Sequence, residues 1–108
     1  MADETPVLDT LADMTAASLA RSSLAPRELM LVRIAALIAV DAPPASYLAN
    51  AEAAEESGVT GDDLQAVMIA VAPVVGSPRV VSAGGEILRA LGLAVAVADA
   101  ELAEDGEE

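Results

Sequence analysis

A single aromatic residue, Tyr47, limits the kind of core that this chain can build. Apolar residues make up 55% of the 108 residues, so a core must consist of Leu, Ile, Val, Met and especially Ala. Ala and Leu are strong helix formers, whereas the β-branched residues that favour sheets gather only in short Val runs. We therefore predict an all-α fold, in the one domain that a chain of this length supports.

The charge and the missing residue types exclude several classes of function. Five Arg, no Lys and 18 acidic residues give a formal charge of -13, which repels phosphate backbones and anionic headgroups. We expect no nucleic-acid partner and no membrane partner. The chain has no Cys and no His, so it lacks thiolate chemistry, disulfides and the usual general base near neutral pH. We expect no cofactor and no metal site.

The first residues and the lengths of the apolar runs bear on location. The start, Met1 to Glu4, is acidic, and no apolar segment of the kind found in secretory signals follows it. The longest apolar stretches cover residues 34–40, 66–75 and 90–98, all shorter than the roughly 18 to 20 residues that cross a bilayer. We therefore expect a cytoplasmic protein.

Prolines, glycines and capping residues divide the chain into five or six helical segments. A proline fits the first turn of a helix because its missing N–H would have no partner there, and Ser or Thr can cap the turn. The predicted segments run from Thr5 to about Arg21, from Pro26 to before Pro43, from Pro44 to Gly58, from Thr60 to Pro73 and Gly76, and from Ser77 onward.

The apolar patterns predict how these segments are used. Helical spacing places Leu29, Met30, Ile34, Leu37 and Ile38 on one face of the second segment. We predict that the second, fourth and fifth segments form the core and that the fourth, almost wholly apolar, is buried. The first is expected to pack over the rest as an arm. The predicted division is a helical arm over residues 1–22, a helical domain over 23–103 and a disordered acidic tail over 104–108.

Two local signals concern helix ends and interruptions. Thr60 and Asp63 have the T-x-x-D spacing of a capping box, and Gly58 is placed to end the third segment in a left-handed conformation. Gly84-Gly85 lies midway along the fifth segment. The two glycines predict a kink or the close approach of a neighbouring helix, and the alternative is a break into two shorter helices. Gly92 is a further candidate end.

Three short segments occur in a recognisable order. Leu24-Ala25-Pro26-Arg27-Glu28-Leu29 leads into an apolar helix, Ser57-Gly58-Val59-Thr60 ends the next, and Asp62-Asp63-Leu64 starts another. Over residues 24–92 this order resembles the carboxymuconolactone decarboxylase and alkylhydroperoxidase D-like family. The resemblance implies a bundle of five or six helices that assembles as a trimer or hexamer.

The reactive residues of that family are replaced in this chain. Matching Gly58 and Ala54 to the family pattern C-x-x-C-x-x-x-H places Pro43 and Ser46 at the two Cys and Asn50 at the His. Pro has no functional group, an unactivated Ser hydroxyl stays protonated, and Asn does not exchange a proton near neutral pH. Thiol peroxidase activity is therefore excluded, and the resemblance implies a fold and an assembly more than a reaction.

A small group of polar residues is the candidate ligand site. Ser46 and Asn50 share a face of the third segment, with Tyr47 beside them, and Glu28 and Arg33 are polar residues within an apolar segment. These five residues are predicted to bind a small organic ligand. The alternative is that Ser46, Tyr47 and Asn50 form a subunit contact or a solvated face. No catalytic residue is assigned.

The carboxylates have a simpler interpretation. Glu28 is expected to pair with Arg33, and Glu86 with Arg89 three residues later, although a buried carboxylate with a raised pKa could transfer protons. The sequence around Asp62 and Asp63 does not have the pattern of a calcium-binding loop. We therefore interpret these carboxylates as solvated residues on a helix face.

Two functions of different class remain. The apolar excess favours a homo-oligomer, since a large exposed apolar patch is usually covered by a partner. The first hypothesis is a non-catalytic or ligand-binding family member whose role is assembly or interaction. The second is a lyase or isomerase-like enzyme that acts on a small organic acid with carboxylate and Arg residues. The absence of His and Cys favours the first.

Overall fold

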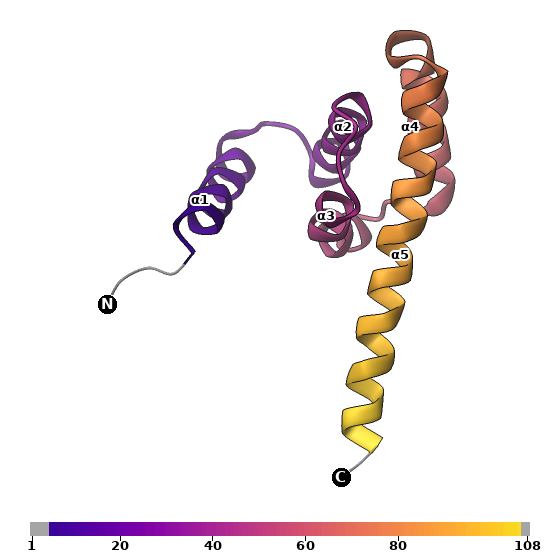
Figure 1. Cartoon of the computed structure of the whole chain (residues 1–108). Helices are drawn as coiled ribbons and strands as arrows, with labels where there is room; N and C mark the ends of the chain where they lie inside the picture. The colour runs from indigo at the N-terminus through magenta and orange to yellow at the C-terminus, as the bar shows by residue number, and fades with distance from the viewer. Residues whose placement is uncertain (1–4, 107–108) are drawn as a thin grey trace.

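The computed structural model describes the backbone of residues 5–106 and the side chains of residues 5–91. Between residues 5 and 106 the chain folds into helices and contains no strand, so the predicted all-α class is confirmed (Figure 1). The helices are α1 (Pro6–Arg21), α2 (Pro26–Ala39), α3 (Pro44–Glu56), α4 (Gly61–Val75) and α5 (Ser77–Gly106).

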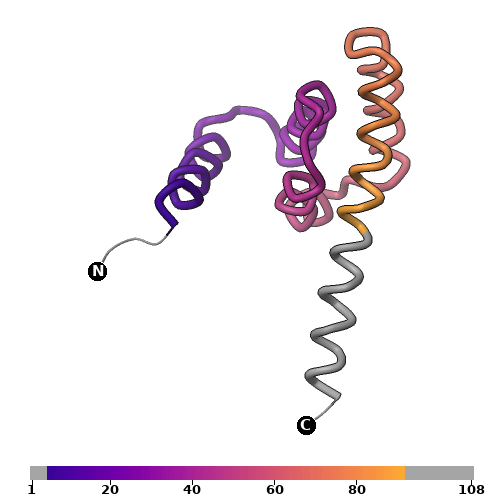
Figure 2. The backbone as a smooth tube through the Cα atoms, in the orientation of Figure 1, coloured from indigo at the N-terminus to yellow at the C-terminus, as the bar shows by residue number. Residues whose placement is uncertain are grey.

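Four of the helices pack against one another. α2 contacts α4, α3 contacts α5, and α2 also contacts α3 and α5. α4 and α5 lie side by side as a hairpin, with α2 and α3 on one side of it (Figure 1). The colours of Figure 2 follow the chain from α2 through α3 into the hairpin of α4 and α5. This arrangement brings α2, α3, α4 and α5 around one interior.

The core consists of two small clusters on either side of α2. Ile34 and Ile38 pack with Ala83 of α5, and Ala42 packs with Tyr47 and Ala90. On the predicted apolar face of α2, Leu29, Met30, Ile34 and Ile38 are buried, and Leu37 is half-buried. Because most of the large buried residues belong to α2, this helix is the centre around which the others pack.

Helix α4 is less buried than its sequence indicates. Leu64, Val67, Met68 and Val71 pack against the core, but no α4 residue is fully buried. Ile69 and Val74 keep 74% and 86% of their surface exposed. The prediction of a buried α4 is wrong for a single chain, because α2 and α5 cover only one side of this helix.

Helix α1 stands apart from the bundle. It has no buried residue and packs against no other helix of the described chain. Two hydrogen bonds from Arg33 Nη2 reach it, to Ser18 Oγ at 3.0 Å and to the Thr15 carbonyl at 3.4 Å. The expected packing of this arm over the rest is therefore not observed. The apolar face of α1 is weak, and an extended link between Arg21 and Pro26 separates the helix from α2. The helix therefore buries no side chain against the bundle.

Helix α5 runs without interruption through the two glycines. It continues from Ser77 past Gly84, Gly85 and Gly92 to Gly106, so neither the expected break nor the further end at Gly92 is observed. A Cβ atom added at Gly84 or Gly85 would meet nothing within 4 Å, so no neighbouring helix of this chain approaches there. Residues 104–106, expected to be disordered, continue the helix, and residues 107–108 lie outside the described part.

The helix ends follow local chemistry closely. Gly58 has φ of +83° and ends α3, as predicted: its N–H donates to the Glu55 carbonyl, and the Val59 N–H donates to the Ala54 carbonyl. The predicted capping box at the start of α4 is also present. Pro73 lies inside α4, which ends two residues later before Gly76, at φ of +86°.

Candidate functional site

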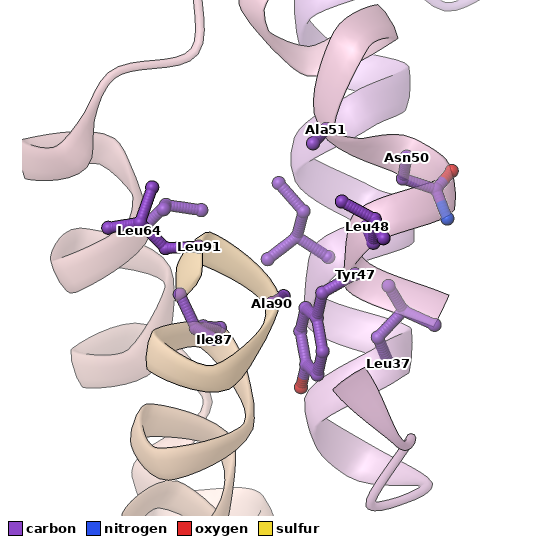
Figure 3. A pocket seen from close by; sticks show the side chains of 10 residues that line it. Leu37, Tyr47, Leu48, Asn50, Ala51, Leu64, Ile87, Ala90 and Leu91 are labelled. Carbon is purple, nitrogen blue, oxygen red and sulfur yellow. The ribbon is translucent and has the colours of Figure 1, made fainter. Parts of the chain in front are cut away.

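A cavity of about 200 Å³ lies among the four packed helices. α2, α3, α4 and α5 all contribute side chains to it, and most of these are apolar (Figure 3). We call it the inner cavity. Its lining residues are Ile34, Leu37, Tyr47, Leu48, Asn50, Ala51, Leu64, Ile87, Ala90 and Leu91.

Tyr47 forms one wall of the inner cavity. Pro44 starts α3 and places Tyr47 on the side of the first turn that faces α5, where only 8% of its surface stays exposed. Its ring lies between Leu37 of α2 and Ile87 and Ala90 of α5 (Figure 3). The aromatic ring is therefore part of the second core cluster and also lines the inner cavity.

The hydroxyl of Tyr47 is buried without a hydrogen-bond partner. Burial raises the pKa of this hydroxyl above its ordinary value of 10.0, and the negative charges of Asp41 and Glu86 raise it further. The group is therefore a neutral hydroxyl across the physiological range and can act as a hydrogen-bond donor, not as a base.

Asn50 lies at the edge of the inner cavity. Its Nδ2 atom donates a hydrogen bond to the Ser46 carbonyl, 2.8 Å away, one turn earlier in α3. In Figure 3 the amide points away from Leu64 and Leu91 on the opposite wall. Ser46 thus fixes Asn50 through its main chain, and the amide adds little polarity to the cavity itself.

A second, open hollow lies between α1 and the bundle. It has a volume of about 340 Å³ and is lined by Met14, Thr15, Ser18, Arg33, Ala36, Leu37 and Asn50. We call it the outer groove. Arg33 reaches across it to Ser18 and Thr15 of α1, so its guanidinium lies in the groove and does not line the inner cavity.

The structure brings the five candidate residues together only in part. Tyr47 and Asn50 meet at the inner cavity, Asn50 and Arg33 meet at the outer groove, and Ser46 supports Asn50. Glu28 is exposed in the first turn of α2 and lines neither hollow. As site residues, Ser46, Tyr47, Asn50, Glu28 and Arg33 therefore remain predictions.

One of the two expected ion pairs forms. Glu86 Oε1 lies 2.7 Å from Arg89 Nη1, as the spacing of three predicts. Glu28 and Arg33 do not pair in the structure, because residues five apart lie on different sides of a helix. Arg33 binds α1 instead.

Asp41 is a residue that the sequence analysis missed. It follows α2 with φ of +56°, the one non-glycine residue at positive φ in the described backbone. Its Oδ1 accepts a hydrogen bond from Ser82 Oγ of α5 at 2.6 Å. A signal was present in the sequence, because Asp tolerates the left-handed conformation at a helix end and Ala42-Pro43-Pro44 forbids further helix.

The chemistry available at the inner cavity is limited. Tyr47 is the one titratable residue among those that line it, and its pKa is raised away from neutrality. Over the described residues, no three acidic side chains gather as metal ligands. The arrangement can enclose an apolar molecule, but it offers no acid and base pair of the kind that proton transfer near pH 7 requires.

Among the described residues, no helix is long and apolar enough to cross a lipid bilayer.

Comparison with known proteins gives one family. The sequence model of the carboxymuconolactone decarboxylase family matches residues 5–90, which includes α1 to α4 and the part of α5 that packs in the bundle. No curated protein and no solved structure matches the chain.

Proposed function

Because the chain belongs to the carboxymuconolactone decarboxylase family, we propose that it is a non-catalytic member that binds a small organic ligand and acts as a homo-oligomeric assembly or interaction protein. The observation that carries this proposal is the inner cavity of about 200 Å³ beside Tyr47 and Asn50. Asn50 stands where the family resemblance implies a reactive His, so the cavity lies beside the family's site while its chemistry has changed.

The size and lining of the inner cavity support ligand binding. An engineered cavity of about 150 Å³ with Leu, Ile and Phe walls binds benzene, so a cavity of this size can hold a ligand of one ring. Small-molecule sites are mostly apolar with a few polar groups, as here with Tyr47 and Asn50.

The groups around the cavity support the proposed non-catalytic role. A general acid or base works best with a pKa near the working pH, and the raised pKa of Tyr47 moves it away from that range. The alternative, a lyase or isomerase-like enzyme acting on a small organic acid, needs a carboxylate beside an Arg. Arg33 lines the outer groove, but no acidic residue lines it with Arg33. The observations therefore favour the binding function.

Exposed apolar side chains support self-association. α1 presents a row of them to solvent, and the hairpin of α4 and α5 exposes further large apolar residues. Within the described part of the chain no helix covers these residues, and a second copy is the partner that the family resemblance implies. The residues are Val7, Leu8, Leu11, Met14 and Leu19 in α1, and Ile69, Val74, Val81 and Leu88 in the hairpin.

Ligand binding can be tested by filling the inner cavity. Ala51 lines the cavity and is exposed at its edge, whereas Ala49 is exposed on α3 and lines neither hollow. We expect toluene to raise the melting temperature of the natural protein and of Ala49→Phe, and to have no such effect on Ala51→Phe. Equal shifts in both variants, or no shift in the natural protein, would contradict the proposed site.

Assembly can be tested by placing a charge at an exposed apolar residue of α4. Analytical ultracentrifugation of the natural protein should give three or six times the chain mass of 10.8 kDa. Ile69→Glu should lower that mass, and the control Ala49→Glu, on the exposed side of α3, should not. A natural protein that sediments as a monomer would refute the homo-oligomer.

A further inference from the structure

We infer that the inner cavity selects an uncharged, apolar ligand of about one ring and rejects organic carboxylates. This inference rests on the proposed binding function and adds the chemical class of the ligand. It also argues against the alternative function, an enzyme that acts on small organic acids.

The walls of the inner cavity provide no counter-ion for a carboxylate. Ile34, Leu37, Leu48, Leu64, Ile87 and Leu91 form most of the surface, and no Arg is among the lining residues. A carboxylate that enters such a site loses its hydration without gaining a counter-ion, which is strongly unfavourable. An apolar ring loses nothing comparable, because it leaves water for an apolar surface.

Three arginines of the bundle have partners outside the inner cavity. Arg33 binds Ser18 and Thr15 of α1 on the outer side of α2. Arg89 pairs with Glu86, and Arg27 pairs with Asp63 at the start of α4. A carboxylate in the inner cavity could gain a contact with any of these three arginines only by drawing it away from its existing partner.

The charges that act on the cavity wall are negative. Asp41, which follows α2 and accepts a hydrogen bond from Ser82 of α5, and Glu86 of α5 both lie near Tyr47. After burial, their negative charges are the causes that raise the pKa of the Tyr47 hydroxyl. A ligand carboxylate beside Tyr47 would experience the same repulsion. The net charge of -13 adds an unfavourable potential for the approach of any anion.

The polar groups at the cavity are also suited to a neutral ligand. Asn50 has already donated one amide hydrogen to the Ser46 carbonyl, and its amide points away from the opposite wall (Figure 3). Tyr47 contributes chiefly its ring face and edge. Aromatic and aliphatic walls of this kind bind rings through shape and dispersion.

Toluene and benzoate form a matched pair of probes, because they share one ring and differ in charge at pH 7. Dissociation constants measured by NMR titration on the full chain should favour toluene by at least about tenfold. Equal or tighter binding of benzoate would overturn the inference and leave the proposed binding function intact. If neither probe binds, the proposed function fails as well. Ala51→Phe should abolish toluene binding, and retained binding there would place the ligand elsewhere and overturn the inference.

A second variant tests the electrostatic cause. Asp41→Asn removes one negative charge while Asn keeps both an acceptor for Ser82 and a tolerance for positive φ. We expect the dissociation constant of benzoate to fall about twofold to fivefold and that of toluene to stay unchanged. An unchanged benzoate constant, or an equal change for both probes, would overturn the role assigned to this carboxylate.

Discussion

At the scale of single residues, Tyr47 combines two opposing contributions. Its ring packs between α2 and α5 and completes the second core cluster, while its hydroxyl is enclosed without a hydrogen-bond partner. A buried hydroxyl with no partner costs about 1 to 3 kcal/mol, whereas the ring contributes by burial and packing. The residue therefore stabilises the fold mainly through its apolar part.

Removing the hydroxyl should test this balance. We predict that Tyr47→Phe leaves the free energy of unfolding unchanged or raises it by up to about 1 kcal/mol, since the ring stays and the unpaired group is lost. Urea denaturation followed by circular dichroism measures the change. Tyr47→Leu, which removes ring packing, should instead lower stability. A clear loss of stability in Tyr47→Phe would show that the hydroxyl has a partner in solution.

Asp63 joins two local interactions at the start of α4. Its Oδ2 accepts a hydrogen bond from the Thr60 N–H at 2.9 Å, its own N–H donates to Thr60 Oγ1 at 3.2 Å, and Arg27 pairs with its carboxylate. The hydrogen bonds from Thr60, and then Arg27, hold the pKa of Asp63 below its ordinary value of 3.8. The charged form is therefore the one that the fold favours.

The lowered pKa of Asp63 predicts how the free energy of unfolding changes with pH. A lowered folded pKa contributes stability that is fully present above pH about 4, and this contribution is lost as the pH falls through the folded pKa. We predict that Asp63→Asn weakens the decline in unfolding free energy below pH 4, measured by urea denaturation in that range. Asp62→Asn removes the same charge from the same turn without touching the capping box, so it should flatten the decline less.

At the scale of elements, the hairpin of α4 and α5 carries two glycines where helix favours alanine. Gly84 and Gly85 lie inside continuous α5, and an added Cβ atom at either position would meet nothing within 4 Å. Glycine costs up to about 1 kcal/mol in a helix interior relative to alanine, because it loses more backbone freedom. The single chain gives no packing reason for this pair.

We predict that Gly85→Ala raises the free energy of unfolding by about 0.5 to 1 kcal/mol. Gly58→Ala is the contrasting variant, because Gly58 ends α3 at φ of +83° and alanine there should lower stability by about 1 kcal/mol. Thermal unfolding at several protein concentrations measures both. If Gly85→Ala reduces stability and the assembled mass together, a second copy approaches α5 at the glycines.

Helix α1 shows how an element can form without packing. Pro6 fits its first turn, and its 16 residues include many Ala, Leu and Met, which favour helix. Isolated helices of this length are marginal in water, so burial of one face normally adds most of the stability. In the described chain that face lies open, and Arg33 donates hydrogen bonds that join α1 to the bundle.

At the scale of the whole molecule, apolar surface and net charge act in opposite directions. The exposed rows of α1 and the hairpin favour association, while a charge of -13 on each chain opposes it. Salt screens repulsion between chains and leaves the burial of apolar surface largely intact.

We therefore predict that self-association strengthens as the salt concentration rises. Between about 0.02 M and about 0.5 M sodium chloride, the Debye length falls several-fold, and the dissociation constant of the oligomer should fall with it. Sedimentation equilibrium measures this constant at each salt concentration. An oligomer that weakens with salt would mean that ion pairs between chains, and not apolar rows, hold it together.

The sequence by itself determined the helical class, the starts of α1 to α4, the end of α3 and the loss of thiol and imidazole chemistry. Pro6, Pro26 and Pro44 each stand at a helix start, and Thr60 and Gly58 form the predicted caps, because these signals act within a few residues of backbone. The Glu86 and Arg89 pair was predictable for the same reason.

Only the tertiary structure decided which helix faces meet. Asp41 and Ser82 lie 41 residues apart in sequence yet share a hydrogen bond, and the inner cavity takes walls from four helices. Apolar periodicity marks a face as able to pack but does not name its partner, which is why α4 and α1 are more exposed than their sequences indicate. Packing between distant segments depends on the whole arrangement, and local backbone signals carry no information about it.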